Sequence, residues 1–197
     1  VALKTREEIE DYTYLVAGCV GAFWTQMCDA HLFGPQRWDS AAQMKDGVLY
    51  GKGLQWVNIL RDVPRDLRNG RCYIPREDLR TVGLVPEQLL NSGTVTMLRP
   101  LYDSYLQLTE EYLRSGWSYT SRIPRSSLRL RMACALPILI GVKTLGLLRV
   151  GNPLDPAVRI KANRSMVRQA LWRSFLAALG FQTWDQVRRW ADPRDVV

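Results

Sequence analysis

The chain has 197 residues, of which 47% are hydrophobic and 23% are charged. This composition excludes a disordered chain and favours one globular domain spanning residues 1–197. Four cysteines without paired spacing indicate neither a zinc site nor a disulfide framework, and favour a reducing, cytoplasmic compartment. The net charge of +8 suits an anionic partner, but no RNA-recognition or zinc-finger pattern is present, so we expect no nucleic acid.

The first predicted helix covers residues 5–32, and it opens with Thr5 and Glu8 in the spacing of a capping box. Tyr12, Val16 and Gly21 lie on or near one stripe of this helix, among other small residues. Small residues let helices approach closely, and they would also leave room for a ligand. Both interpretations stay open on the sequence alone.

The second predicted helix covers residues 40–67, with a capping box at its start, and carries the most informative pattern of the chain. Gln55, Asn58, Asp62 and Asp66 follow one another at steps of three, four and four. This spacing places two amides and two carboxylates on one helix face. Burying four such groups between apolar neighbours would be costly without something to coordinate.

Two carboxylates one turn apart, with amide oxygens nearby, suit Mg²⁺, which binds a few protein oxygens and completes its shell with water and phosphates. Arginines follow the same turn, as recognition of a diphosphate requires; they are Arg61, Arg65, Arg68 and Arg71. A solvated helix face with Asp–Arg pairs would show the same two aspartates and is the alternative interpretation.

The rest of the chain is also predicted to be helical. Pro64 should kink the second helix between its aspartates, and Asn69-Gly70 should end it before a short extended piece. We expect an all-α bundle around a central cavity, because no alternating strand pattern occurs. The further helices are expected at residues 75–79, 86–90, 97–119, 125–148 and 157–179, with a short turn at 184–190. The apolar run 132–142 is too short to span a bilayer.

The string Q-x-x-N-x-x-R-D-x-x-x-D that ends at Asp66, followed by G-R-x-Y-x-P, resembles the second aspartate-rich motif of the squalene/phytoene synthase family. Residues 12–21 resemble that family's Y-x-x-x-V-A-G-x-V-G helix. The resemblance covers residues 8–79 strongly and the remainder loosely. It implies a class I isoprenoid synthase-like bundle whose first helices, with the first aspartate-rich motif, are missing, so that this chain is the C-terminal portion of the domain.

The resemblance also implies an activity: a Mg²⁺-dependent prenyltransferase that joins two farnesyl or two geranylgeranyl diphosphates head to head and releases diphosphate. The catalytic residues it implies are Tyr12, Asp62 and Asp66, and the metal ligands are Asp62, Asp66 and Asn58. The substrate-binding residues it implies are Val16, Gly21, Leu54, Gln55, Asn58, Arg61, Arg71 and Tyr73. The isolated chain is expected to be inactive.

Alternatives remain at this stage. Many relatives carry an acid where Arg65 stands, which makes the metal site of this chain less negative. The enzyme could stop at presqualene diphosphate or hydroxysqualene, and NADPH for a reductive finish stays open although no G-x-G-x-x-G unit is present. A non-catalytic helical scaffold is the rival of another class. Residues 122–173 hold one acid, Asp155, among eleven Lys or Arg, which leaves a peripheral membrane contact open. No feature predicts the oligomeric state.

Overall fold

The structure is a computed structural model that describes residues 2–32, 39–158 and 160–192. Within these ranges the chain forms helices and no strand, and one isolated bridge joins Ala2 to Cys72. The all-α prediction is confirmed. The elements in chain order are α1 (Arg6–Thr13), the π-helix η1 (Tyr14–Gly18), α2 (Cys19–His31), α3 (Ser40–Arg61), α4 (Val63–Arg68), α5 (Arg76–Thr81), the 3₁₀ helices η2 (Pro86–Leu90) and η3 (Ser92–Thr94), α6 (Val95–Arg122), α7 (Leu128–Val150), α8 (Arg164–Ala178) and α9 (Trp184–Ala191).

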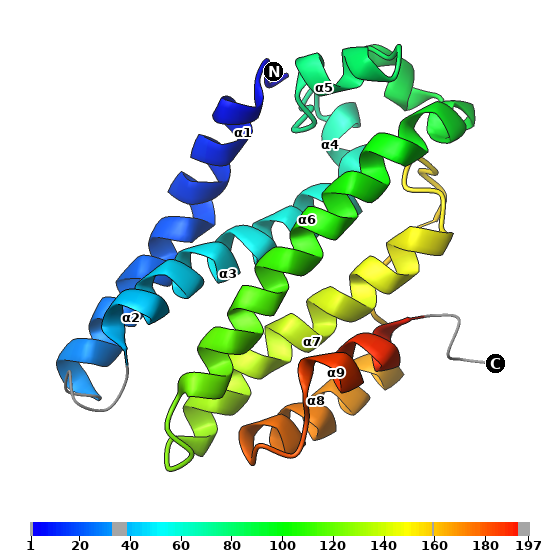
Figure 1. The fold of residues 1–197 in the computed structure, drawn as a ribbon. Coiled ribbons are helices and arrows are strands. Elements are labelled where there is room, and N and C mark those ends of the chain that lie inside the picture. The colour runs from blue at the N-terminus through cyan, green and yellow to red at the C-terminus, as the bar shows by residue number, and fades with distance from the viewer. Residues whose placement is uncertain (1, 33–38, 159, 193–197) are drawn as a thin grey trace.

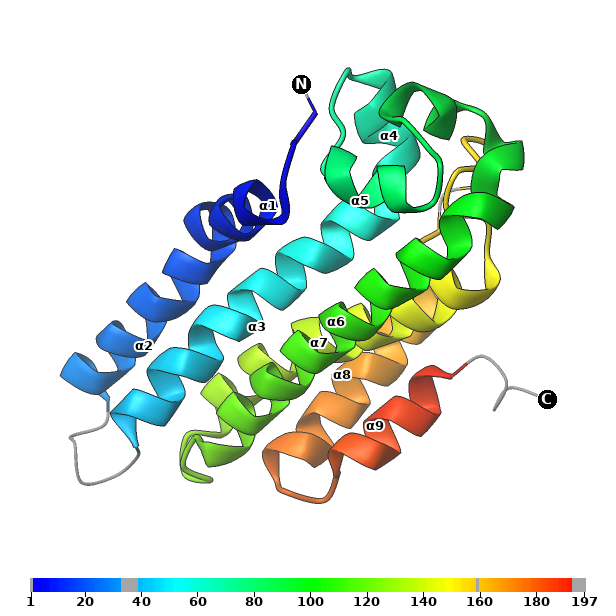
Figure 2. The same ribbon diagram turned by 45° about the horizontal axis from the view of Figure 1, so that its top comes forward.

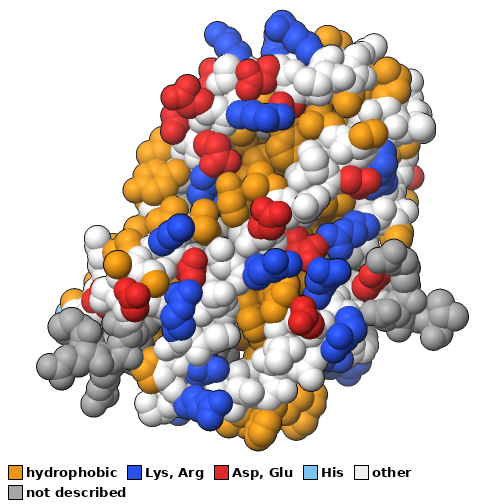
Figure 3. Space-filling model, viewed as in Figure 1, with side chains coloured by type: hydrophobic (Ala, Val, Ile, Leu, Met, Phe, Trp, Pro, Cys, Tyr) orange, Lys and Arg blue, Asp and Glu red, His pale blue; other side chains and the backbone are white. Residues whose placement is uncertain are grey.

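Three long helices, α3, α6 and α7, run through the middle of the molecule (Figure 1). The α1–η1–α2 rod flanks α3 on one side, and α8 with α9 covers α7 on the other, as Figure 2 also shows. The short helices from α4 to η3 gather at one end of the bundle, near the N-terminus. Viewed in the same orientation, the surface between α1 and α6 is apolar and bordered by charged side chains (Figure 3).

The first rod has the predicted extent but is not one α-helix, because a π-helical turn separates α1 from α2. Thr5 caps α1 by accepting a hydrogen bond from the Glu8 amide at 3.3 Å. The Glu8 carboxylate accepts from the amide of Lys4 at 2.5 Å, not from that of Thr5. Only half of the predicted capping box therefore forms.

The capping box predicted at the start of α3 is wrong. Asp39 is the N-cap, and its side chain accepts from the Ala42 amide at 3.0 Å. Ser40 instead donates its hydroxyl hydrogen to Asp29 at 2.9 Å. Gln43 is buried and donates to the carbonyl of Tyr119 in α6 at 3.1 Å. Its side chain therefore contacts α6 and does not bond to the backbone amide at the start of α3, as the capping box would require.

Pro64 breaks the second predicted helix instead of kinking it. The α-helix α3 ends at Arg61, Asp62 leaves the helical range at φ −99° and ψ 11°, and α4 restarts at Val63. The proline nitrogen has no hydrogen to donate to the carbonyl of Leu60. That carbonyl accepts from the hydroxyl of Tyr102 in α6 instead, at 2.9 Å.

The core lies where α3, α6 and α7 meet. Trp56 of α3 is fully buried and stacks on Tyr105 of α6 with ring centroids 4.8 Å apart. An apolar stripe follows α6 at steps of three and four residues and is mostly buried, with only Leu108 and Tyr112 half-buried; its members are Leu98, Leu101, Tyr102, Tyr105, Leu108, Tyr112 and Leu113. Burying such side chains is the main stabilising contribution to a helical bundle of this kind.

The end of the bundle that carries the short helices is held by a buried carboxylate. Asp78 of α5 is 2% exposed and accepts hydrogen bonds from Arg6 Nε at 2.7 Å and from the hydroxyl of Tyr105. These contacts join α1, α5 and α6. Gly70, at φ 71°, ends α4 in the left-handed region, which glycine adopts without steric cost.

The C-terminal helices differ from the prediction in their bounds. Residues 157–163 are not helical where the structure describes them, because Asn163 caps α8 by accepting from the Met166 amide at 2.9 Å. The last predicted turn is a helix of eight residues, α9. By length and mean hydropathy, 1.7 over its most apolar window, α7 could cross a bilayer, but 61% of that window is buried inside the bundle. It serves here as a core helix.

Candidate active site

The break between α3 and α4 sets the two aspartates of the motif at different positions. Asp62 lies in the break itself, and Asp66 lies one turn later on α4. The Arg61 guanidinium holds both carboxylate oxygens of Asp62, with Nε 3.0 Å from Oδ1 and Nη2 2.6 Å from Oδ2. Such a two-pronged ion pair fixes the orientation of the carboxylate, and the bond to Asp62 raises the pKa of Arg61.

Asp66 is half-buried, and its burial raises the pKa of its carboxyl group. The nearby Asp62 carboxylate acts in the same direction, whereas Arg71, Arg65 and Arg61 oppose it. The Arg71 backbone stays next to α4, because its amide donates a hydrogen bond to the Asp66 carbonyl at 2.8 Å. The Asp66 carboxylate therefore lies near a second carboxylate and three arginines, which is an arrangement suited to a cation together with an anionic group.

Asp62 lines a surface hollow of about 340 Å³ next to α4. Three arginines share this hollow with it, and the loop after α7 closes the other side. Its lining residues are Arg61, Asp62, Pro64, Arg65, Arg68, Asp155, Pro156 and Val158. Guanidinium groups around a hollow of this kind match the oxygens of a phosphate ligand.

Tyr12 reaches the same end of the bundle from α1. Its ring stacks on that of Tyr73, with centroids 4.8 Å apart and an interplanar angle of 27°. Its hydroxyl oxygen accepts from Gln55 Nε2 at 3.4 Å. Burial, with a smaller contribution from Tyr73, raises the pKa of Tyr12 to about 12, so the phenol stays neutral at physiological pH. The structure thus brings together three predicted site residues from α1, α3 and the segment after α4.

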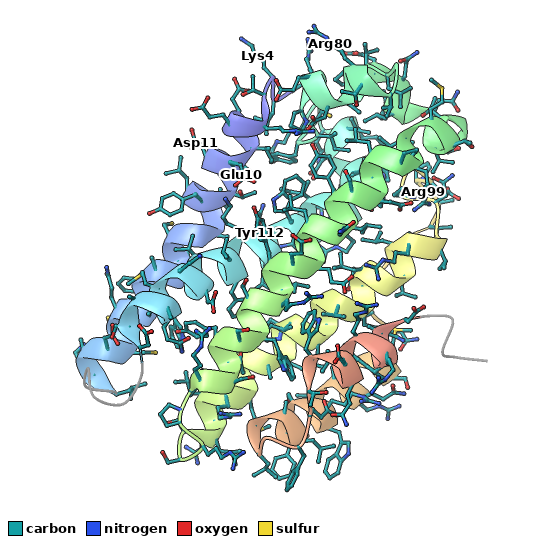
Figure 4. All side chains as sticks on the ribbon, in the orientation of Figure 1. Lys4, Glu10, Asp11, Arg80, Arg99 and Tyr112 are labelled. Carbon is teal, nitrogen blue, oxygen red and sulfur yellow. The ribbon has the colours of Figure 1, made fainter. Side chains whose placement is uncertain are left out.

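The sequence interpretation missed a polar cluster beside this tyrosine. Lys52 of α3 forms an ion pair with Glu10 of α1, and Tyr112 of α6 donates to Glu10 Oε1 at 3.4 Å. Figure 4 shows Glu10 and Tyr112 on neighbouring sides of α1 and α6. Lys52 precedes Gln55 by three residues, so the same helical spacing that selected the motif would have selected this lysine.

Other predicted residues lie elsewhere on these helices. Val16 is 47% exposed and lies one turn after Tyr12. Gly21 packs against α3, where a Cβ atom would lie 1.9 Å from the carbonyl oxygen of Gly47. Leu54 is half-buried and packs on the core, and Asn58 is exposed. Of the two interpretations left open for the small residues, Gly21 therefore shows close packing between helices.

The oxygen donors of the site fit Mg²⁺. Among the residues that the structure describes, no three or more His, Cys, Asp or Glu side chains form a group that could enclose a metal. Asp62 and Asp66 supply two carboxylates, and Asn58 supplies an amide oxygen. Because Mg²⁺ is commonly bound through one or two carboxylates plus water and substrate phosphates, this donor set suits a metal that arrives with a phosphate ligand.

Comparison with known proteins identifies the family. The family model described as squalene/phytoene synthase matches residues 1–165. The chain belongs to the squalene/phytoene synthase family. Its residues are 35% identical to the 15-cis-phytoene synthase of Synechocystis sp. over 117 residues, which is 57% of this chain and 35% of that protein. They are 35% identical to the chloroplastic phytoene synthase of Daucus carota over 94 residues, 47% of this chain and 23% of that protein.

Solved structures show the same fold. The complex of TcSQS with the ligand BPH1237 has a TM-score of 0.76 at 15% identity and covers 97% of this chain and 60% of its own. A dehydrosqualene synthase in complex with a ligand has a TM-score of 0.70 at 25% identity, covering 88% of this chain and 58% of its own. The chain therefore spans about 60% of these solved chains, and about a third or less of the two curated relatives.

Proposed function

We propose that the whole protein is a Mg²⁺-dependent prenyltransferase that condenses two farnesyl diphosphates, or two geranylgeranyl diphosphates, head to head. The product is of the squalene or phytoene type, and diphosphate is released. The observation that carries the proposal is the α3–α4 break, which holds Asp62 and Asp66 among arginines at the end of the bundle where Tyr12 lies. Relatives named phytoene synthase and dehydrosqualene synthase support this class of product.

The residues of the break would act on the leaving group. Asp62, Asp66 and Asn58 would hold Mg²⁺, which neutralises charge on a departing diphosphate when it is bound. Arg61 and Arg71 would donate hydrogen bonds to phosphate oxygens as the carbon–oxygen bond breaks. Since both oxygens of Asp62 now accept from Arg61, binding of the metal and the diphosphate would redistribute that guanidinium from the carboxylate to the phosphate.

The aromatic and apolar side chains would act on the carbon chain. The rings of Tyr12 and Tyr73 would offer electron-rich faces that stabilise an allylic cation. The Tyr12 phenol, with its pKa raised to about 12, would keep its proton near the reacting carbons. Val16 and Leu54 would contribute an apolar wall that excludes water, and Gly21 would allow the helices to come close enough to form it.

Product analysis of the full-length protein tests this function. We would incubate it with farnesyl or geranylgeranyl diphosphate and Mg²⁺, with and without NADPH, and identify the lipid-soluble products. Asp62→Ala is expected to reduce product formation at least about a hundredfold. The matched control Asp103→Ala removes an exposed carboxylate of α6 that pairs with Arg99 at 3.4 Å and should leave activity intact. Absence of any product from either substrate in a folded protein would refute the proposal.

The same assay separates the possible reactions within the family. A squalene-type product that requires NADPH would indicate a reductive finish. Presqualene diphosphate or hydroxysqualene in both arms would indicate an enzyme that stops earlier. A forty-carbon product made only from geranylgeranyl diphosphate would indicate the phytoene branch.

A non-catalytic scaffold is the second candidate, because one observation favours it. Arg61 neutralises Asp62, and Arg65 adds another positive charge to the same hollow. Calorimetric titration with Mg²⁺ and inorganic diphosphate separates the two candidates. Binding of diphosphate that depends on Mg²⁺ and is lost in Asp62→Ala supports the enzyme, whereas no binding supports the scaffold.

A further inference from the structure

The surface at the α8–α9 turn exposes large apolar side chains far from the candidate active site. Trp172 is 63% exposed and Phe181 is 71% exposed, and Leu171 and Leu179 are also exposed. The ring of Trp172 stacks on Phe175 with centroids 5.7 Å apart. Apolar atoms come to the surface at this lower end of the molecule in Figure 3. Clustered exposed aromatic side chains on a folded protein mark an interaction site.

This apolar surface belongs to one face of α8 that also carries arginines. The face begins with positive charge and becomes apolar toward the end of the helix. After it, Gly180 turns the chain at φ 83°, and Phe181 extends the apolar part. The side chains of the face recur at helical steps of four, three, four and four, and are Arg164, Arg168, Leu171, Phe175 and Leu179.

The charge around this face is positive. Residues 160–192 hold six Lys or Arg and two Asp. Within the described ranges of the chain, Arg164, Arg168 and Arg173 form no ion pair. Arg168 and Arg173 also line a hollow of about 450 Å³ together with Trp172 and Gln182. Exposed guanidinium groups without carboxylate partners beside a largely apolar hollow suit a lipid, whose phosphate lies next to its acyl chains.

The α1–η1–α2 rod has a second exposed apolar face, and its charge differs from that of the α8 face. The α1–η1–α2 rod exposes Val20 by 58%, Phe23 by 60% and Trp24 by 45%. Helix α2, which carries these three side chains, has one acidic residue, Asp29, and no Lys or Arg. An anionic surface would meet no cationic side chain on α2, whereas α8 attracts it.

We propose that the α8–α9 end of the molecule binds the surface of an anionic lipid bilayer. Trp172 and Phe181 enter the interfacial region, where aromatic side chains are favoured. Arg164 and Arg168, both exposed, contact lipid phosphates, and each contributes roughly a fivefold gain in partitioning. The docking surface is separate from the residues of the proposed reaction, so it stands whether or not the protein is an enzyme.

Vesicle binding of the whole protein tests the proposal. We would measure sedimentation with phosphatidylcholine vesicles, with and without phosphatidylglycerol, at low and high salt. Binding should require phosphatidylglycerol and weaken as salt rises. The double variant Trp172→Ser with Phe181→Ser, and the double variant Arg164→Gln with Arg168→Gln, should each lower binding at least about tenfold.

The control is the double variant Phe23→Ser with Trp24→Ser, which removes exposed rings from α2, a helix without Lys or Arg. It should change binding less than about twofold. Equal binding to neutral vesicles, or an equal loss in this control, would overturn the proposal. Binding of inorganic phosphate without vesicle binding would also overturn it, because the arginines would then form a soluble-anion site. Circular dichroism of each variant establishes that a loss is not unfolding, and Arg164→Lys with Arg168→Lys should retain binding.

Discussion

Helix α3 meets the α1–η1–α2 rod along two stretches that are built differently. In the stretch next to η1 and α2, glycines bring the two backbones into contact: a Cβ on Gly21 would lie 1.9 Å from the carbonyl oxygen of Gly47, and one on Gly51 would lie 2.2 Å from that of Ala17. In the stretch next to α1, long polar side chains fill the gap, with Glu10 contacting Lys52. Figures 1 and 2 show the rod close to α3 at its α2 end and farther away at its α1 end.

The difference separates two roles within one sequence motif. The glycines of the V-A-G helix set how closely the helices approach, which is a packing role. Tyr12, at the open end of the same rod, contacts Gln55 and Tyr73, which the proposed function places beside the substrate. Substitutions in the close stretch should therefore lower stability, and those in the open stretch should lower activity more than stability.

The largest effect is expected in the close stretch. Gly21→Ala places a Cβ against a backbone carbonyl that cannot move without shifting α3, so we expect a loss of about 3 kcal/mol in the free energy of unfolding. Urea denaturation measures it. Val20→Ala, at a side chain that is 58% exposed on the same helix, should change stability by less than about 0.5 kcal/mol. A Gly21→Ala protein as stable as the parent would refute the packing role.

The second effect concerns the ion pair at the open end. Lys52 is buried, with 11% of its side chain exposed, whereas its partner Glu10 is 40% exposed. Lys52→Met leaves a carboxylate that water reaches, so the cost should be about 1 kcal/mol. A double-mutant cycle with Glu10→Gln should give a coupling free energy of similar size. The exposed pair Arg76–Glu87, 4.0 Å apart, is the control and should couple by less than about 0.5 kcal/mol; equal coupling in both pairs would contradict the burial argument.

The third prediction concerns a substitution that should raise the free energy of unfolding, where the first two lower it. Because burial and the Asp62 carboxylate raise the pKa of Asp66, the folded protein binds that proton more tightly than the unfolded chain does. Ionised Asp66 therefore destabilises the fold, and the loss appears as pH rises from the ordinary value of 3.8 through the raised folded pKa. Asp66→Asn should stabilise the protein at neutral pH by less than about 1 kcal/mol and lower product formation.

Thermal unfolding of Asp66→Asn and the parent between acidic and neutral pH measures this. The gain should vanish at low pH, where both states of the parent are protonated. Asp103→Asn, at an exposed carboxylate of α6, is the control and should show no such pH-dependent gain. If Asp66→Asn instead destabilised the protein at neutral pH, the carboxylate would have a structural role, and the argument that it lowers stability in favour of function would be wrong.

The elements that local chemistry determines were predictable from the sequence. The all-α class follows from helical periodicity. Pro64, which cannot donate to Leu60, predicted a disturbance of the helix beside the two aspartates, although the helix breaks at Asp62 where a kink was expected. The motif that joins Gln55 to Asp66 led to the family that the comparison established. These features depend on covalent geometry and on spacing along one helix.

Features that depend on contacts between helices were not predictable. Ser40 was expected to cap α3, but Asp39 does so because Ser40 and Gln43 bond to other elements. The start of α8 was placed too early, since residues 157–163 have the composition of a helix and only the Asn163 cap marks the boundary. The pairing of Lys52 with Glu10 joins two helices that only the tertiary fold brings together.

The smallest effect on stability is expected at Tyr12, and it is the sharpest test of the open stretch. Tyr12→Phe keeps the ring that stacks on Tyr73 and removes one hydrogen bond from Gln55, of 3.4 Å. The free energy of unfolding should change by less than about 0.5 kcal/mol, while product formation should fall at least about tenfold if the phenol lies at the reacting carbons. Calorimetric melting and product analysis of the full-length variant, with Tyr14→Phe at an exposed tyrosine of the same rod as the control, measure both quantities. Equal activity in Tyr12→Phe and the parent would assign Tyr12 to packing, and the open stretch would then differ from the glycine stretch in its side chains but not in its role.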